Sequence, residues 1–441
     1  MLCGIGLGIA SANAAVIKVA ITNPVPDAKV VLKFENNEKE EFTVDANGKG
    51  MIELNNFTAQ YVTLQYGRST RTLYLDPHMD LSMSFEGKRM YKAISFTGAG
   101  AAANSYLNSG KLAQASYQEA KLPEKEFIKT TDSLYYANMK ELNSHKLPAA
   151  FANAEKKRLK YYSYLNFPMF TIYHAYMNKL KDFKASPNFY RRLKELTDIN
   201  PDLLVFNEYK EFLFNAITTL GLNGDSYTDQ LSLLKSQLNY IENNVKNPTV
   251  REHLVYTVAY NYVKRSGVDE ADIAVKAVNK YVDDAEKKGK FDKVYQDWKK
   301  IAVGQPSPVF SGKDMNGNVV TLHQLKGKFI YIDVWATWCG PCRGELPHLK
   351  KLEEQFRGKE VEFVSLSCDQ KEAPWKKTVE KEQLKGVQLH IGSGSKFMQE
   401  YMISGIPRFI LLDKEGKIIS ANMSRPSDPA TAKKLNELLG L

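Results

Sequence analysis

A Cys-x-x-Cys motif constrains the fold of this chain more than any other feature. Cys339 and Cys342 stand directly after the apolar run FIYIDVWA and directly before the amphipathic segment RGELPHLKKLEEQF. The first segment predicts a buried strand and the second a helix, which places the cysteines in the first helical turn. Residues three positions apart lie on the same helix face, so their sulfurs can close a disulfide with little change in the backbone.

The position at a helix start gives the two thiols different chemistry. Unpaired backbone N–H groups and the helix dipole favour a thiolate at Cys339, which we predict to be the exposed nucleophile. Cys342 lies one turn further in and is predicted to be the buried resolving thiol. Gly340 keeps the turn permissive, and Pro341 has no N–H group to leave unpaired. Half of a zinc site is the alternative, but neither Cys368 nor the histidines form a second paired motif, so no metal is expected.

Two carboxylates beside the motif are candidate proton carriers. Asp333 interrupts an otherwise apolar strand, and a buried acid with a raised pKa can take and return the proton of Cys342. An acid at the strand end that reaches water is the alternative. Glu345, three residues after Cys342, provides a second relay or serves as an ordinary first-turn carboxylate that stabilises the helix N-terminus.

Pro407, in the segment SGIPRFILLD, stands immediately before another apolar strand. A proline there can take a cis peptide bond in a tight turn. A loop edge beside the thiols can then pair with the backbone of a substrate as an added strand. We predict Trp338, Ile406, Pro407 and Arg408 as substrate-binding residues.

Three folded regions follow from the periodicity of the apolar residues. Residues 15–97 contain short alternating runs between turn residues, which predict an all-β domain built as an antiparallel sheet or small sandwich. Residues 98–302 show helical spacing and predict an all-α domain, whose many Tyr and Phe side chains are core residues or, alternatively, line a peptide groove. After the Pro-containing stretch 303–310, strands and helices alternate over 303–441, which predicts an α/β domain with a largely parallel sheet.

The first 14 residues have the features of a secretory signal sequence. They are small and apolar, and Ala12-Asn13-Ala14 matches the small-x-small pattern of a signal peptidase site, although no Lys or Arg precedes Lys18. A buried first strand is the alternative. We expect cleavage near Ala14, loss of Cys3 with the signal sequence, and a periplasmic location.

The positive net charge does not indicate a nucleic-acid partner. The chain has 60 Lys and Arg against 50 Asp and Glu residues, a formal charge of +10. The two signs are interspersed, and no basic block, zinc knuckle or aromatic RNA-binding signature accompanies them. A solvated mixed surface is expected.

The segment VGQPSPVFSGKDMNGNVVTLHQLKGKFIYIDVWATWCGPCRGELP resembles the thioredoxin superfamily, in particular the extracytoplasmic reductases of the TlpA and ResA type. The shared motifs are G-x-x-x-P-x-F, D-x-N-G-x-x-V-x-L and W-A-T-W-C-G-P-C-R-x-E-x-P. The resemblance covers residues 304–441 and implies a thioredoxin fold. It also implies that Cys339 attacks, Cys342 resolves, Pro407 is a cis-proline opposite the thiols, and Glu345 is the acid that follows the second cysteine.

Three further positions are interpreted through the resemblance. Asp333 resembles the buried aspartate of cytoplasmic-type thioredoxins. Arg408 stands where many relatives have Thr, which implies a cation beside the substrate groove. Cys368 stands where relatives tend to have an acid or a small residue, and we interpret it as a buried, inert thiol.

Together these features predict a periplasmic thiol-disulfide oxidoreductase that reduces the disulfides of envelope proteins without a metal or organic cofactor. A membrane electron-transfer protein would have to renew its reductant. An envelope binding or assembly protein with an accessory redox domain is the alternative. A dithiol peroxidase is a third possibility, but Ile332 and Ala336 replace the Pro and Thr of the peroxidatic P-x-x-x-T-x-x-C pattern.

Overall fold

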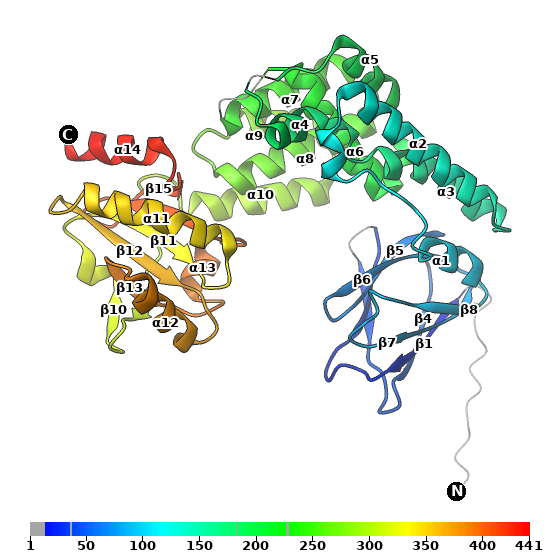
Figure 1. The fold of residues 1–441 in the computed structure, drawn as a ribbon, viewed down its shortest axis with the longest axis horizontal. Helices are drawn as coiled ribbons and strands as arrows, with labels where there is room; N and C mark the ends of the chain where they lie inside the picture. Colours follow the sequence, from blue (N-terminus) through cyan, green and yellow to red (C-terminus); the bar gives the residue numbers. More distant parts are fainter. Residues whose placement is uncertain (1–13, 36–37, 182, 226–228) are drawn as a thin grey trace, which may run out of the picture. The chain divides into compact units, whose positions relative to one another are not determined.

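The computed structural model describes residues 14–35, 38–181, 183–225 and 229–441 (Figure 1). The predicted signal sequence therefore lies outside the described residues, except for Ala14. The chain divides into two compact units, Met1–Leu254 and Val255–Leu441. Among the described residues, no helix has both the length and the apolar character needed to cross a bilayer.

The β-rich region forms two four-stranded sheets, in the orders β4-β1-β7-β8 and β3-β2-β5-β6. Side chains of β1 alternate between the core and solvent, as the period of two predicts. The pairing of β1 with β7 is parallel, which departs from the predicted antiparallel arrangement. The strands are β1 (Ala15–Thr22), β2 (Val30–Lys33), β3 (Lys39–Phe42), β4 (Lys49–Leu54), β5 (Gln60–Tyr66), β6 (Ser69–Leu75), β7 (Asp80–Glu86) and β8 (Ser95–Gly98).

The helical region follows directly and packs on the β-rich region within the first unit. The ring of Tyr61 on β5 contacts Phe151 and Phe206, and its hydroxyl donates to the buried carboxylate of Glu155. The helices are α1 (Ala101–Leu107), α2 (Glu124–Asn143), α3 (Ala149–Tyr164), α4 (Phe170–Asn178), α5 (Pro187–Leu196), α6 (Asn207–Leu222), α7 (Gln230–Asn244), α8 (Pro248–Ser266), α9 (Asp272–Tyr281) and α10 (Ala285–Lys299). Short 3₁₀ turns accompany them at Tyr117–Lys121, Phe167–Met169 and Pro201–Val205.

The aromatic residues of these helices supply much of the core. On α6 the apolar positions recur every three or four residues, and Tyr209, Phe212 and Leu213 are fully buried. Tyr161 of α3 packs its ring against both Tyr209 and Phe212. The interpretation of the Tyr and Phe side chains as core residues is confirmed for this cluster.

The C-terminal α/β region contains one seven-stranded sheet in the order β10-β9-β13-β12-β11-β14-β15. Only the pairs β11/β12 and β12/β13 are parallel, so the prediction of a largely parallel sheet is wrong: β14 returns antiparallel to β11. The strands are β9 (Ser311–Lys313), β10 (Val319–Thr321), β11 (Phe329–Trp335), β12 (Val361–Ser367), β13 (Val387–His390), β14 (Arg408–Leu412) and β15 (Ile418–Met423).

Helices cover both faces of this sheet, as the sequence predicts. Leu349 and Leu352 of α11 share a core with Leu435 of α14 on one face, and Trp375 of α12 packs on the other (Figure 1). The helices are α11 (Gly340–Gln355), α12 (Glu372–Glu382), α13 (Lys396–Glu400) and α14 (Pro429–Leu439), with a 3₁₀ turn at Leu322–Leu325. This is the thioredoxin fold class that the motif indicates.

The division into compact units differs from the predicted boundary at residue 303. The second unit begins inside α8, so α9 and α10 belong with the α/β region. Asn422 Nδ2 donates to the Arg265 carbonyl at 2.9 Å, and the Arg408 guanidinium lies 5.7 Å from the ring centre of Trp298 on α10. The stretch 303–310 marks the change from helical spacing to alternating strands and helices in the sequence. The two contacts just described join residues that lie before this stretch to residues that lie after it.

A fragment that begins at Val268 is expected to be more stable than one that begins at Val303. Only the longer fragment contains Trp298, which is buried and packs against Arg408. Loss of a buried aromatic ring and its cation contact should lower the free energy of unfolding by about 1 to 3 kcal/mol. Urea unfolding of the two oxidised fragments measures the difference, and equal stabilities would show that α10 contributes nothing to the redox domain.

Candidate active site

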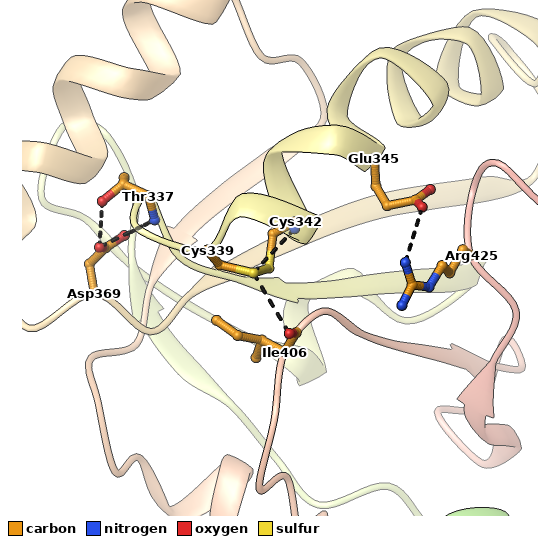
Figure 2. Close-up of a disulfide and its surroundings, with 7 residues drawn as sticks. All are labelled: Thr337, Cys339, Cys342, Glu345, Asp369, Ile406 and Arg425. Carbon is orange, nitrogen blue, oxygen red and sulfur yellow. Dashed lines mark hydrogen bonds and ion pairs between the residues drawn. A yellow bond between two sulfur atoms is a disulfide. The ribbon is translucent and has the colours of Figure 1, made fainter. Parts of the chain in front are cut away.

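The redox disulfide lies where β11 ends and α11 begins. Cys339 is the N-cap residue of α11, and its sulfur is bonded to that of Cys342, with 5.3 Å between the Cα atoms. The backbone N–H of Cys342 donates to Cys339 Sγ at 3.1 Å (Figure 2). A sulfur in the N-cap position therefore receives the hydrogen bond that a Ser or Asp side chain accepts in other helices. The same contact stabilises a thiolate when the disulfide is open.

The disulfide is less accessible than the sequence predicts. Cys339 is only 5% exposed and Cys342 2% exposed, so the expectation of an exposed Cys339 is wrong for the disulfide state. Both belong to an apolar cluster that includes Trp335 and Trp375. Trp338, directly before Cys339, is 70% exposed and is the large side chain that the site presents to solvent.

The Ile406–Pro407 peptide bond is cis, as the sequence allowed. The Ile406 carbonyl oxygen lies 3.7 Å from Cys339 Sγ, and the Ile406 side chain packs on the same apolar cluster (Figure 2). The loop before β14 therefore borders the nucleophilic sulfur. Of the predicted substrate-binding residues, Ile406 and Pro407 stand in this loop, and Trp338 directly precedes Cys339 in the chain.

Arg408 has other partners than the sequence predicts. Its Nη1 donates to the Ala421 carbonyl at 3.2 Å, and its guanidinium lies over the ring of Trp298. Burial lowers the pKa of this guanidinium. The cation is thus held by contacts with β15 and α10, and its place beside a substrate groove stays a prediction.

Asp333 is buried in the middle of the sheet, as predicted. It is 4% exposed, and its Oδ1 has no hydrogen-bond partner among the described residues. Burial raises the pKa of Asp333 to about 8, with smaller contributions from the negative charges of Glu345 and Glu353. A carboxyl with this pKa exchanges protons with a thiol at little cost in free energy, because an ordinary cysteine has a pKa of about 8.5.

Glu345 is buried and bound to the loop before α14. Its two carboxylate oxygens accept hydrogen bonds from the N–H and Oγ of Ser427, at 3.0 and 2.9 Å. Arg425 approaches to 3.6 Å, and the carboxylate points toward that residue rather than toward the sulfurs (Figure 2). Glu345 thus ties α11 to the C-terminal loop and contributes to the raised pKa of Asp333.

Cys368 has the character of a structural thiol. It is buried in the apolar cluster that also holds the disulfide, and it is not bonded to another cysteine. Burial raises the pKa of Cys368 to about 11, with a further contribution from the charge of Asp369. A thiol with so high a pKa is a poor nucleophile near neutral pH.

Asp369 and Thr337 are site residues that the sequence analysis did not identify. Asp369 follows β12 and accepts hydrogen bonds from both the N–H and the Oγ1 of Thr337, two residues before Cys339 (Figure 2). The sequence feature that could have identified Asp369 was its position, as an acid, at the carboxyl end of a strand that neighbours β11. The carboxyl ends of adjacent parallel strands meet at one edge of a sheet, which is where sites of α/β proteins form.

Sequence comparisons with known proteins identify the family to which the C-terminal region is similar. A family model described as Redoxin matches residues 302–439. The thiol-disulfide oxidoreductase ResA of Bacillus cereus is 33% identical over 125 residues, which cover 28% of this chain and 72% of that protein. The chain belongs to the ResA-type thiol-disulfide oxidoreductases. It is thus an oxidoreductase of the thioredoxin superfamily, and its chemistry is thiol-disulfide exchange.

A second ResA and two solved structures are also similar in sequence. ResA of Bacillus subtilis (strain 168) is 25% identical over 129 residues, 29% of this chain and 72% of that protein. A solution structure from Bacteroides vulgatus has 66% sequence identity and a TM-score of 0.29, and covers 31% of this chain and 91% of its own. The thioredoxin domain of another thiol-disulfide oxidoreductase from Bacteroides vulgatus has 31% identity and a TM-score of 0.29, with coverages of 31% and 98%.

Asp333→Asn is expected to change how stability depends on pH. The native carboxyl keeps its proton up to a pKa of about 8, against an ordinary value of 3.8. Native protein therefore binds more protons than unfolded chain between these values, so the free energy of unfolding falls as the pH rises from about 4 to about 8. Asn does not titrate, so this fall is absent from the variant. At pH 8 the free energy of unfolding of the variant should exceed that of wild type by on the order of a few kcal/mol.

Urea unfolding of the oxidised proteins at pH 5 and pH 8 measures this effect. Asp314→Asn is the matched control, because the hydrogen bond from Asn318 lowers the pKa of that carboxylate. The control should lose stability above pH 4, which is the opposite sign. A gain for Asp333→Asn that is equal at both pH values would contradict a buried, protonated Asp333.

Proposed function

We propose that this chain is a periplasmic protein-disulfide reductase that acts through Cys339 and Cys342. The observation that carries the proposal is the disulfide at the first turn of α11, bordered by the exposed Trp338 and by the Ile406 carbonyl. A substrate backbone that lies along the loop before β14 would bring its own disulfide to Cys339. The substrates we propose are disulfide-containing proteins of the cell envelope.

The reaction needs two thiols and no other redox group. In the reduced enzyme, the Cys339 thiolate attacks one sulfur of the substrate disulfide, which breaks the S–S bond and releases the other substrate sulfur as a thiolate that takes a proton. A mixed disulfide now joins Cys339 to the substrate. Cys342 loses its proton and attacks Cys339 Sγ, which forms the Cys339–Cys342 disulfide and releases the second substrate thiolate, and this thiolate also takes a proton from water. The substrate gains two electrons and two protons, so we propose no metal or organic cofactor.

Asp333 is the proposed base for the second step. Cys342 is almost fully buried, so its thiolate has little help from water. A buried carboxylate can accept the proton of Cys342 and, when the enzyme is reduced again, return it. The raised pKa of Asp333 keeps the acid protonated in the resting oxidised enzyme at neutral pH. Glu345 is already held by Ser427 and Arg425, which favours Asp333 over Glu345 in this role.

The reducing direction and the location are proposed together. The Gly-Pro pair between the cysteines resembles that of reducing thioredoxins. Each turnover leaves the enzyme oxidised, so the dithiol must be regenerated. The periplasm is kept oxidising, and we propose that a membrane electron-transfer thiol protein supplies the electrons. The signal pattern before Ala15 supports export to that compartment.

Cys342→Ser is expected to accumulate covalent complexes with substrate proteins. The variant keeps the attacking thiol and loses the resolving one, so the mixed disulfide cannot be released. The complexes should occur in the periplasmic fraction, contain a chain that begins at or near Ala15, and disappear on treatment with reductant. Non-reducing electrophoresis and mass spectrometry of the trapped species measure this.

Cys339→Ser and Cys368→Ser are the matched controls for the trap. Cys339→Ser should capture few or no partners, and Cys368→Ser should behave as wild type. Several different secreted Cys-containing proteins in the trap support a general reductase, whereas one envelope partner supports a dedicated assembly role. Equal trapping by Cys339→Ser and Cys342→Ser would overturn the assignment of the nucleophile.

Asp333→Asn is expected to slow release of the mixed disulfide more than its formation. Cys342 needs a base for its attack, whereas the proposed Cys339 thiolate does not. A loss of about 10²-fold in the release step is the expected size, since general bases contribute about 10² to 10⁴-fold. Rapid-quench kinetics with a disulfide peptide separates the two steps. Equal slowing of both, or of neither, would discard Asp333 as the base, and Glu345→Gln would then be measured in the same way.

A further inference from the structure

Asp369 is a buried acid that the dithiol chemistry does not itself require. It stands two residues after β12 and is 3% exposed. In the register of the parallel pair β11/β12, Trp335 lies opposite Ser367, so both strands end at the same edge of the sheet. Asp369 thus lies beside the segment that leads from β11 into α11.

The Asp369 carboxylate accepts hydrogen bonds from uncharged donors. Oδ2 accepts from the Thr337 N–H at 3.0 Å and from Ser367 Oγ at 2.8 Å, and Oδ1 accepts from Thr337 Oγ1 at 2.7 Å. The ring Nε2 of His390 lies 2.7 Å from the Asp369 carbonyl oxygen and fixes the backbone of the acid. Two of these three hydrogen bonds come from Thr337, so the Asp369 side chain fixes the position of that residue.

Thr337 belongs to the turn that delivers the nucleophile. The Cys339 N–H donates to the Ala336 carbonyl at 3.1 Å, which closes the turn around Thr337 and Trp338. The Cys368 N–H donates to the Trp335 carbonyl at 2.9 Å, which ties an earlier residue of the same segment to the end of β12. The segment between β11 and α11 is therefore anchored beside β12 at two points.

We propose that Asp369 is a positioning residue for Cys339, acting through Thr337; this inference rests on the proposed dithiol reaction and adds a residue to it. Sulfur chemistry depends on placement at the ångström scale, since a displaced nucleophile loses both its approach and its stabilising donor. Cys339 Sγ must meet the Cys342 N–H at 3.1 Å and lie beside the Ile406 carbonyl. Asp369 fixes the turn from which that sulfur is presented.

Placement and charge can be separated at this position. In Asp369→Asn the amide oxygen can occupy the place of Oδ2 and accept from the Thr337 N–H and Ser367 Oγ, while the amide nitrogen donates to Thr337 Oγ1. That variant loses the charge and keeps the turn. Asp369→Ala loses both. Thr337→Val loses one of the two hydrogen bonds from Thr337, and Thr337→Ser restores it.

The test measures the reactivity of Cys339 alone in the full chain. Cys3, Cys342 and Cys368 are replaced by Ser, which leaves Cys339 as the only thiol among the four cysteines of the sequence. Alkylation by iodoacetamide is followed from pH 5 to pH 10. Asp369→Ala should slow alkylation about tenfold at pH 7 and move the midpoint of the pH profile upward by about one pH unit, because the thiolate loses its aligned N–H donor.

The conservative variants separate the two hydrogen bonds from the charge. The alkylation rate of Asp369→Asn at pH 7 should stay within about twofold of that of the parent protein. The rate of Thr337→Val should be about threefold lower than that of the parent, and Thr337→Ser should restore it. Asp413→Ala is the matched control for stability, because its carboxylate also accepts two backbone N–H groups, from Glu415 and Lys417, in a hairpin outside the active site. It should lower the melting temperature and leave alkylation unchanged.

Two outcomes would overturn the proposal. One is an alkylation profile of folded Asp369→Ala that is identical to that of the parent. If the alanine variant does not fold, an unchanged profile of Thr337→Val has the same consequence. The other is an effect of Asp369→Asn as large as that of Asp369→Ala, which would assign the effect to charge and not to placement. Failure of the proposed function is seen separately, as absence of trapped substrates in Cys342→Ser while the alkylation profiles still shift as expected.

Discussion

The hydrogen bond from the Cys342 N–H to Cys339 Sγ is the contact on which the remaining features of the site depend. It exists because α11 begins at the residue after Cys339, which leaves the first N–H groups of the helix without partners in the helix itself. A sulfur in the N-cap position is the acceptor that the helix needs, and the helix supplies the partial positive charge that a thiolate needs. The fold and the chemistry thus use one and the same contact.

The structure stabilises this contact from several directions. Strand β11 brings the chain to the helix start, Asp369 holds the turn through Thr337, and the Ile406–Pro407 loop closes the other side. Asp333 lies within the sheet with its carboxyl buried and its pKa near 8. Such an acid lowers the stability of the fold at alkaline pH, since burial of its charge is unfavourable. Proteins retain groups of this kind where proton transfer needs them.

Local sequence predicted the parts of the site that are determined within one segment. The strand, the motif and the helix are contiguous, so the positions of Cys339 and Cys342 followed from periodicity and from the spacing of three. The burial of Asp333 followed from a single acid in an apolar strand. The alternation of strands and helices predicted for 303–441 was also correct from β11 to α13, although the sequence analysis did not identify β13.

Features that depend on contacts between distant segments could not be predicted in this way. The direction of β14 relative to β11 is a property of the return path of the chain, which periodicity does not record. The contact of Asp369 with Thr337 joins residues that are 32 positions apart, and the contact of Arg408 with Trp298 spans two regions that composition separates.

The central claim is that Cys339 alone attacks a substrate disulfide. The most direct measurement is a single-turnover reaction of the fully reduced chain with a disulfide peptide, quenched with acid within milliseconds and mapped by mass spectrometry after proteolysis. We expect the peptide to be found on Cys339 at early times, and to disappear as the Cys339–Cys342 disulfide forms. A transient adduct on Cys342, or formation of the intramolecular disulfide without any adduct on Cys339, would contradict this assignment.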